Sequence, residues 1–274
     1  MLFRKDDYVL SFSVQGINVF ITDVHREAYS DLEVLYIIDN GTFNQYFTKN
    51  AFRAALESGV NFYSSESEFL NYQKDLRNHC NNFEQFFDLK IKNKDSISKE
   101  VLSEFFNFTI KLCKDYTKMN FEYTDKAFTL KEQNKVIGSN LRILSKFKDE
   151  VRSFMNVVLF EKTGYLNEVL RTLSKQFDLA SIVLENLTQQ ELLSLFNGVK
   201  PVESIILKRQ DAFVCTYNSP VFYEGVAAKE IIANFKDSLG KISEVSGQVA
   251  SKGKVIGRVK LILVNYSDVT NLSA

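Results

Sequence analysis

Histidine and cysteine side chains supply most of the nucleophiles and soft metal ligands that proteins use near neutral pH. This sequence has only two histidines, His25 and His79, and three cysteines, Cys80, Cys113 and Cys215. The cysteines are far apart and form no C-x-x-C pair, which argues against a zinc site and against a disulfide framework. We therefore expect free, buried thiols, a reducing compartment and no metal site in this chain.

Neither histidine has surroundings typical of a catalytic group. His25 lies in the segment Asp23-Val-His-Arg-Glu, which reads as a turn after a strand. His79 falls on the apolar stripe of a predicted helix, where a packed side chain is far commoner than a reactive one. The sequence thus offers no histidine that we would assign to catalysis.

Carboxylate pairs could perform acid–base chemistry, and two occur here, at Asp6-Asp7 and at Glu66 with Glu68. Surface acid clusters are much commoner than catalytic dyads, so we read both pairs as surface residues. The sequence has no G-x-x-x-x-G-K-[ST] loop, no G-x-S-x-G turn and no H-E-x-x-H helix. We name no catalytic residue and no metal ligand, and the residues that would bind a cofactor are unknown at this point.

Charge and hydropathy narrow the possible partners. The 34 basic and 34 acidic residues balance, so the net positive field of a nucleic-acid-binding protein is absent. A short basic run could form a local patch, although solvated surface side chains are its commoner explanation: Lys252, Lys254, Arg258 and Lys260. The sequence shows neither an apolar signal region nor a membrane-length apolar run, so we expect a cytoplasmic protein without membrane contact.

The elements that must position any site are mainly helical. With 24 Phe and 12 Tyr the chain can fill a sizeable core, and two prolines among 274 residues favour long regular elements. We predict an α+β fold whose first part, residues 1–60, is a small antiparallel sheet packed on helices. Its hairpins are expected at 8–14 with 17–22, around Gln15-Gly16, and at 34–39 with 42–47, around Asn40-Gly41.

A helical scaffold is predicted over residues 61–240. Helices are expected at 65–83, capped by Ser65, at 98–119, capped by Ser98, and at 141–159 and 163–177, with a polar loop at 120–137. Lys148 falls in the apolar register of the third helix, where we expect its stem to pack and its ammonium group to reach water.

A short helix after residue 187 has the clearest local signals. Thr188 and Glu191 have the spacing of a capping box, Leu187 can pack on Leu192, and Gly198 suits the left-handed residue after a helix. Further on, 212–217 and 221–223 are predicted to form a hairpin, followed by a helix at 226–239.

The last segment, 242–264, is strand-like and punctuated by glycines. It contains the pattern G-x-x-A-[SP]-x-G-x-x-x-G-x-[VA] at Gly247, Ala250, Gly253, Gly257 and Val259. Glycines at such spacing permit tight bends and close backbone contacts. This segment resembles the opening of the mobile domain of phosphoenolpyruvate-utilising enzymes, a compact β/β/α domain. An ordinary glycine-punctuated hairpin is the alternative.

The preceding region is similar to the same family. The run Leu187-Thr-Gln-Gln-Glu-Leu resembles the helix that precedes this domain in phosphoenolpyruvate synthase-like proteins. Arg209, the strand from Phe213, Tyr223-Glu-Gly225 and the following Ala227-Ala-Lys-Glu-Ile resemble the linker into the mobile domain. The resemblance covers residues 187–264.

The resemblance implies phosphoryl transfer through a histidine on a domain that swings between two sites, with ATP and Mg²⁺ used by an intact member. The family places this histidine in a T-x-G-G-x-x-[ST]-H motif, which these 274 residues lack. We therefore expect 241–274 to be an incomplete swivelling domain. Its strand at 261–264 would have an unpaired edge and poor order.

Two functional hypotheses follow. The chain is expected to be a fragment or split member of a phosphoenolpyruvate-utilising phosphotransferase, inactive alone, whose remaining catalytic domains act in cis or in trans. Alternatively, it is a non-catalytic interaction protein that keeps the family's helical scaffold. The DNA that follows codon 274 would distinguish these hypotheses, and the sequence leaves the enzyme assignment open.

Overall fold

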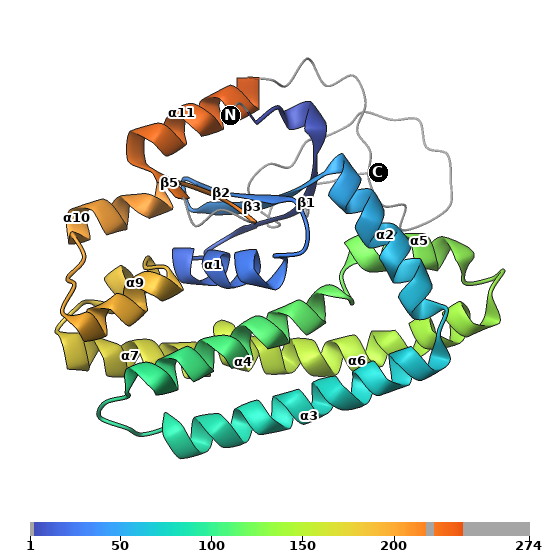
Figure 1. The fold of residues 1–274 in the computed structure, drawn as a ribbon, viewed down its shortest axis with the longest axis horizontal. Helices are drawn as coiled ribbons and strands as arrows, with labels where there is room; N and C mark the ends of the chain where they lie inside the picture. The colour runs from blue at the N-terminus through green and yellow to red at the C-terminus, as the bar shows by residue number, and fades with distance from the viewer. Residues whose placement is uncertain (1–2, 218–221, 238–274) are drawn as a thin grey trace, which may run out of the picture. The chain divides into compact units, whose positions relative to one another are not determined.

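The computed structural model describes residues 3–217 and 222–237. They form an α+β unit, mainly helical, with one small antiparallel sheet, which confirms the predicted fold class (Figure 1). The pattern at Gly247, Ala250, Gly253, Gly257 and Val259 lies outside the described residues. So do the predicted domain at 241–274 and its expected unpaired strand.

Five strands make up the sheet, and each pairs with its neighbours in antiparallel orientation in the order β1-β3-β2-β4-β5. The predicted Asn40-Gly41 turn is confirmed, since both residues have positive φ (48° and 74°) and join β2 to β3. The strands are β1 (Tyr8–Gln15), β2 (Val34–Asp39), β3 (Thr42–Thr48), β4 (Ala212–Thr216) and β5 (Phe222–Glu224).

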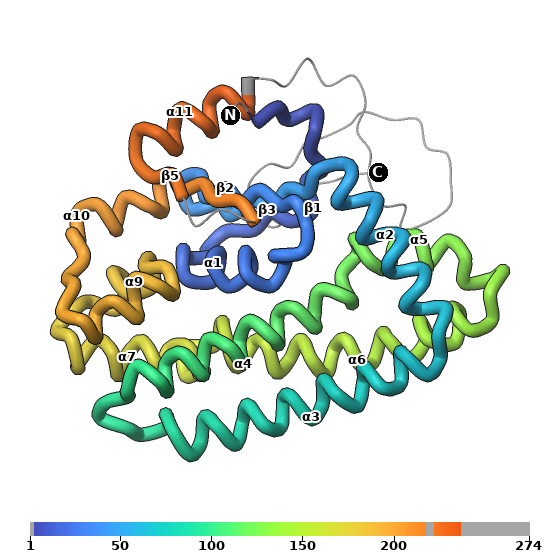
Figure 2. The backbone as a smooth tube through the Cα atoms, in the orientation of Figure 1, coloured from blue at the N-terminus to red at the C-terminus, as the bar shows by residue number. Residues whose placement is uncertain are grey.

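Two strands of this sheet come from the far part of the sequence. β4 pairs with β2 from Leu35 opposite Thr216 to Asp39 opposite Ala212, and β5 continues the sheet beyond β4. The tube in Figure 2 shows the blue N-terminal strands beside the orange ones. The predicted hairpin after residue 212 is confirmed, and it ties the later segment to the N-terminal strands.

The prediction of a strand at 17–22 is wrong, because this segment begins helix α1 (Val19–Ala28). The Asn18 side chain accepts a hydrogen bond from the Ile21 amide at 2.9 Å and so starts the helix. Residues 19–24 are all buried, so the run shows no polar face and cannot be told from a buried strand by periodicity. β1 pairs with β3 instead.

The remaining helices form the greater part of the unit. The predicted caps are confirmed at Ser65 and Ser98, whose side chains accept from the amides of Glu68 and Val101. The helices are α2 (Lys49–Tyr63), α3 (Glu66–Lys90), α4 (Lys99–Thr117), α5 (Phe121–Leu130), α6 (Lys135–Leu159), α7 (Tyr165–Phe177), α8 (Ser181–Glu185), α9 (Gln189–Ser194), α10 (Glu203–Ile206) and α11 (Gly225–Asp237).

The loop predicted at 120–137 is wrong as well. Residues 121–130 are helix α5, and α6 already begins at Lys135. On α5 Glu122, Thr124 and Ala127 are buried, whereas Phe128 is exposed. Because two of these buried residues are polar, the sequence of α5 shows no apolar stripe at helical spacing.

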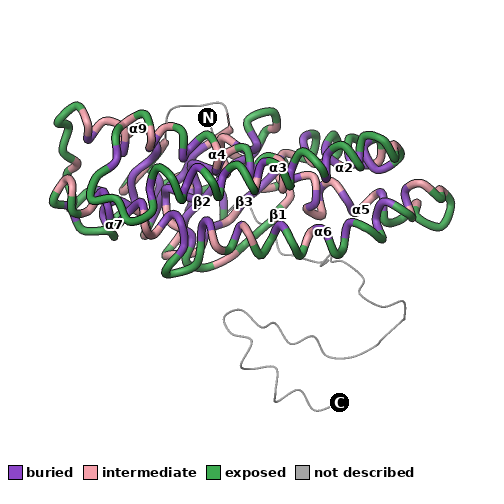
Figure 3. The backbone as a smooth tube through the Cα atoms, turned by 90° about the horizontal axis from the view of Figure 1, so that it is seen from below, coloured by how far each residue is buried: buried purple, intermediate pink, exposed green. Residues whose placement is uncertain are grey.

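The sheet separates two apolar layers. One face packs on α1 and the long helices beyond it, and the other face is covered by α11 through Ala228, Ile232 and Phe235. Figure 3 shows that the long helices carry buried residues on one side and exposed residues on the other. None of the helices in the described part of the chain is both long and apolar enough to span a bilayer.

Candidate functional site

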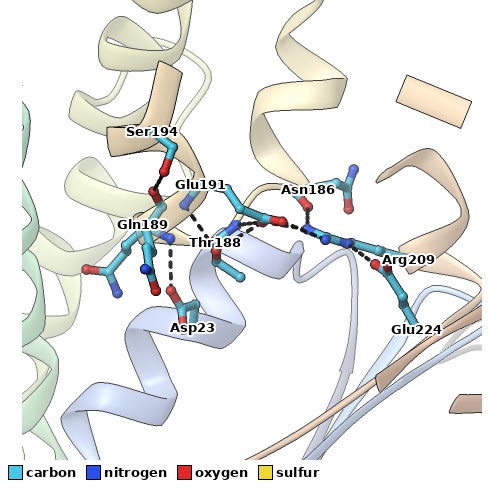
Figure 4. Close-up of polar contacts among 9 residues, drawn as sticks. Asp23, Asn186, Thr188, Gln189, Glu191, Ser194, Arg209 and Glu224 are labelled. Carbon is cyan, nitrogen blue, oxygen red and sulfur yellow. Dashed lines mark hydrogen bonds and ion pairs between the residues drawn. The ribbon is translucent and has the colours of Figure 1, made fainter. Parts of the chain in front are cut away.

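Arg209 connects three segments of the chain, through Asn186, Glu191 and Glu224. It lies in the turn that precedes β4 and is 2% exposed, so its guanidinium group needs charged or polar partners inside the fold. Nη1 donates to Glu191 Oε2 at 2.7 Å and to the Asn186 carbonyl at 2.9 Å. Nη2 donates to Glu191 Oε1 at 2.8 Å, and Nε donates to Glu224 Oε2 at 2.6 Å (Figure 4).

The start of α9 is built around the same carboxylate. Glu191 accepts from the Thr188 amide at 2.8 Å, and Thr188 Oγ1 accepts from the Glu191 amide at 3.3 Å, which confirms the predicted capping box. Burial alone would raise the pKa of Glu191, but its hydrogen bonds with Arg209 and Thr188 hold that pKa below its usual value. The carboxylate therefore stays ionised and keeps the arginine in place.

A second carboxylate, that of Asp23, holds the start of α9 against α1. Asp23 on α1 accepts from the Gln189 amide at 2.9 Å, at the positive end of α9, and also binds Arg26 (Figure 4). The Arg209 network itself contains one cation and two carboxylates. The net charge of the network is negative, so it would repel a phosphate group. We therefore read it as a structural ion-pair network and not as an anion-binding site.

His79 is packed, as the sequence predicted. Its Nε2 donates to the Phe108 carbonyl oxygen at 2.9 Å, and its ring stacks on Phe108 with 5.4 Å between ring centroids. Burial lowers the pKa of His79. One of its two ring nitrogens is therefore engaged by a backbone carbonyl of α4.

His25 is not in a turn, because it lies within α1 and faces the sheet. Its Nδ1 is 3.5 Å from Gln45 Oε1, and its ring meets Phe43 edge to face. Burial lowers the pKa of His25, so its imidazole is neutral at pH 7. It borders a cavity between the sheet and the helices.

This cavity, of about 530 Å³, is the more promising place for a ligand. Its walls come from β1, α1, β3, the end of α4, the start of α5 and the second half of α6. Six of the described side chains around it are ionisable: His25, Tyr29, Tyr116, Glu122, Lys148 and Arg152. A concave mixture of apolar and convergent polar groups is the usual form of a small-molecule site.

A buried hydrogen bond forms the floor of the cavity. Tyr29 donates its hydroxyl hydrogen to Glu122 Oε1 at 2.5 Å and accepts from Asn120 Nδ2 at 3.0 Å. Burial raises the pKa of Glu122, and it raises the pKa of Tyr29 well above 10. Tyr29 is thus a permanent hydrogen-bond donor to this carboxyl group.

Two cations lie on one face of α6 at the cavity wall. The sequence predicts that the ammonium group of Lys148 reaches water. In the structure it donates to the Met119 carbonyl oxygen instead. Burial, and then the neighbouring charge of Arg152, lower the pKa of Lys148. Arg152 donates from Nε to the Tyr116 hydroxyl at 3.2 Å. Together they make this wall electropositive.

The other residues singled out from the sequence lie apart from both places. Asp6, Asp7, Glu66 and Glu68 are exposed, as predicted. The three cysteines are unpaired, and burial raises the pKa of Cys80 and of Cys113 to about 12. No group of three or more candidate ligands for a metal ion occurs in residues 3–217 and 222–237.

Sequence analysis missed the cavity residues for identifiable reasons. Glu122 lies in a segment predicted as loop, and Tyr29 is 93 positions away from it. Lys148 did carry a signal, since a lysine on an apolar helical stripe is unusual.

Comparison of the chain with protein families, curated proteins and solved structures found no match.

Proposed function

We propose that residues 1–240 are the non-catalytic scaffold of a phosphoenolpyruvate-utilising phosphotransferase of the swivelling type. In this proposal residues 241–274 open its mobile domain. The carrier histidine and the sites for ATP and Mg²⁺ belong to the remaining catalytic domains, in cis or in trans.

The observation that carries the proposal is the set of partners of Arg209. Thr188, Glu191, Arg209 and Glu224 are all positions through which the chain resembles the family, and they meet in one network. Glu224 immediately precedes α11, the last described helix before residue 241. The network therefore fixes the start of this helix on the helical body, which is what a scaffold for a moving domain must do.

The surroundings of the two histidines support a chain that is inactive alone. A phosphoryl carrier needs an accessible ring nitrogen that can attack and later release the phosphoryl group. His79 Nε2 is bonded to a backbone carbonyl, and His25 is turned toward the sheet beside Gln45. Neither side chain is free to move between two sites.

The test starts from the DNA that follows codon 274. We expect it to encode, in the same or a shifted frame, a segment with the motif T-x-G-G-x-x-[ST]-H. Produced together with this chain and with the domains that hold the ATP and Mg²⁺ sites, that segment should take acid-labile phosphoryl label from phosphoenolpyruvate or from ATP. Absence of the motif from every frame of the following DNA would favour the non-catalytic interaction protein instead.

A non-catalytic interaction protein is the second candidate, and an exposed apolar patch favours it. Val199, Val202 and Ile205 are each 46–58% exposed and line a hollow of about 300 Å³ beside Arg209. Contiguous exposed apolar side chains commonly mark contact surfaces. Unrelated DNA after codon 274 would leave this as the better function.

A cytoplasmic location is part of the same proposal. It is supported by the three unpaired thiols, of which Cys113 and Cys215 are buried. Free cysteines are typical of proteins in reducing compartments.

A further inference from the structure

The cavity beside β1 and α6 has the size and lining of a ligand site, and this is independent of the proposed function. Its volume of about 530 Å³ lies within the range of small-molecule pockets. Part of its wall is apolar and comes from Val14, Ile17, Met155 and Phe160. An apolar molecular body can therefore be buried there.

The guanidinium group of Arg152 has N–H donors that are available to a ligand. Within residues 3–217 and 222–237 its only hydrogen-bond partner is the Tyr116 hydroxyl, which it reaches through Nε. The two terminal amino groups have no such partner there. A guanidinium fork with two available amino groups matches the two oxygens of a carboxylate.

Lys148 lies one helical turn before Arg152 on α6 and lines the same cavity. Its ammonium group is half-buried and bonded to one carbonyl oxygen, and it lies 5.7 Å from the centre of the Tyr116 ring. An ammonium group can make three hydrogen bonds, so it retains capacity for an anion. The two cations thus converge on one end of the cavity.

The charge balance of the cavity sets the charge of the ligand. Among the described residues that line the cavity, Glu122 is the one acidic group, and Tyr29 holds that carboxyl group at the floor. With His25 neutral, the lining carries two cations and one carboxylate, and Asp149 on the same helix adds a negative charge that acts on both cations. These two acidic groups repel a dianionic phosphate group more strongly than a monoanion, while Arg152 and Lys148 can still pair with one carboxylate.

We propose that this cavity binds a small organic monocarboxylate with an apolar body. Its carboxylate pairs with Arg152 and Lys148, and its body packs against Val14, Ile17 and Met155. Burial of the apolar part of the ligand contributes affinity, and the two cations favour a carboxylate over an uncharged group.

The test measures binding of benzoate and hexanoate to the full chain by calorimetry or ligand-observed NMR. Benzamide and hexanamide serve as uncharged probes of the same shape, and phenyl phosphate serves as a dianion. We expect the acids to bind at least about tenfold more tightly than the amides, the size of one lost charge-assisted hydrogen bond.

Four variants locate the site. Arg152→Gln and Lys148→Met should each weaken acid binding by about tenfold or more. Arg142→Gln and Lys146→Met, at exposed positions of the same helix, should leave it unchanged. If Lys148→Met fails to fold, Arg152→Gln, at an exposed position, decides the result.

Any of four results would overturn the proposal. One is equal affinity for acids and amides, and one is no saturable binding of any probe at millimolar concentration. Another is wild-type affinity in Arg152→Gln. The fourth is tighter binding of phenyl phosphate than of benzoate, which would make the cavity a phosphate site instead.

Discussion

Arg209 holds Glu191 through two parallel hydrogen bonds, Nη1 to Oε2 at 2.7 Å and Nη2 to Oε1 at 2.8 Å. The same carboxylate closes the capping box with Thr188, so the first turn of α9 and the turn before β4 share one charged group. Two-point contacts of this kind fix orientation as well as distance. The pair therefore determines how the chain enters β4, β5 and α11.

Removing the arginine should destabilise the fold. In Arg209→Met the Glu191 and Glu224 carboxylates lose their cation, and breaking a buried pair in this way costs about 3 kcal/mol. Arg209→Lys should recover only part of this, because an ammonium group cannot form the fork. Urea denaturation measures the loss, with Arg142→Met on exposed α6 surface as the control. A loss below about 0.5 kcal/mol, typical of surface changes, would contradict the role of Arg209.

The buried carboxyl group of Glu122 should make stability depend on pH. Burial raises its pKa, so the folded chain holds this proton more tightly than the unfolded chain. The stability that this bound proton contributes is fully present below the unfolded pKa, at about pH 4.3, and is lost as pH rises through the folded pKa. Glu122→Gln, which does not titrate, should therefore gain stability relative to wild type as pH is raised from 4 to 7.

Tyr29→Phe provides the matched comparison for this group. It removes the hydroxyl that donates to the ionised Glu122, so its loss of stability should be larger at pH 7 than at pH 4. Denaturation of both variants and wild type at these two pH values measures the differences. A difference from wild type that does not change with pH in either variant would mean that Glu122 does not titrate in the fold as described.

Gly59 should tolerate no side chain. A Cβ atom there would lie 1.7 Å from the Tyr123 carbonyl oxygen, where α2 passes α5. Glycine to alanine normally stabilises a helix interior by about 1 kcal/mol, but here the two helices must separate. We expect Gly59→Ala to lower the free energy of unfolding by about 1–3 kcal/mol. Ser58→Ala, one residue earlier and exposed, should be neutral or slightly stabilising, and equal effects of both changes would contradict the close approach.

The elements that the sequence predicted well are those with local signals. Ser65, Ser98 and Thr188 each bond to an amide three residues on, and Asn40-Gly41 supplies the two positive φ angles of its turn. These signals need only neighbours in the chain, so they can be read without the fold.

The cavity could not be predicted in the same way. It depends on Tyr29 meeting Glu122 and on Lys148 meeting the Met119 carbonyl oxygen, which are contacts between separate segments of the chain. Residues 19–24 after Asn18 are all buried, as in a strand that is covered on both faces, and the buried side of the helix with Glu122 carries polar residues. Both errors arose where tertiary contacts, rather than local preference, decide the structure.

Incubation of the purified chain with radiolabelled phosphoenolpyruvate, or with γ-labelled ATP, in the presence of Mg²⁺ tests the scaffold function most directly. With His79 bonded to Phe108 and His25 facing the sheet, we expect no acid-labile label on the protein. Acid-labile label on the wild-type chain that is lost in His25→Ala or His79→Ala would contradict the account, because the chain would then carry the phosphoryl group itself.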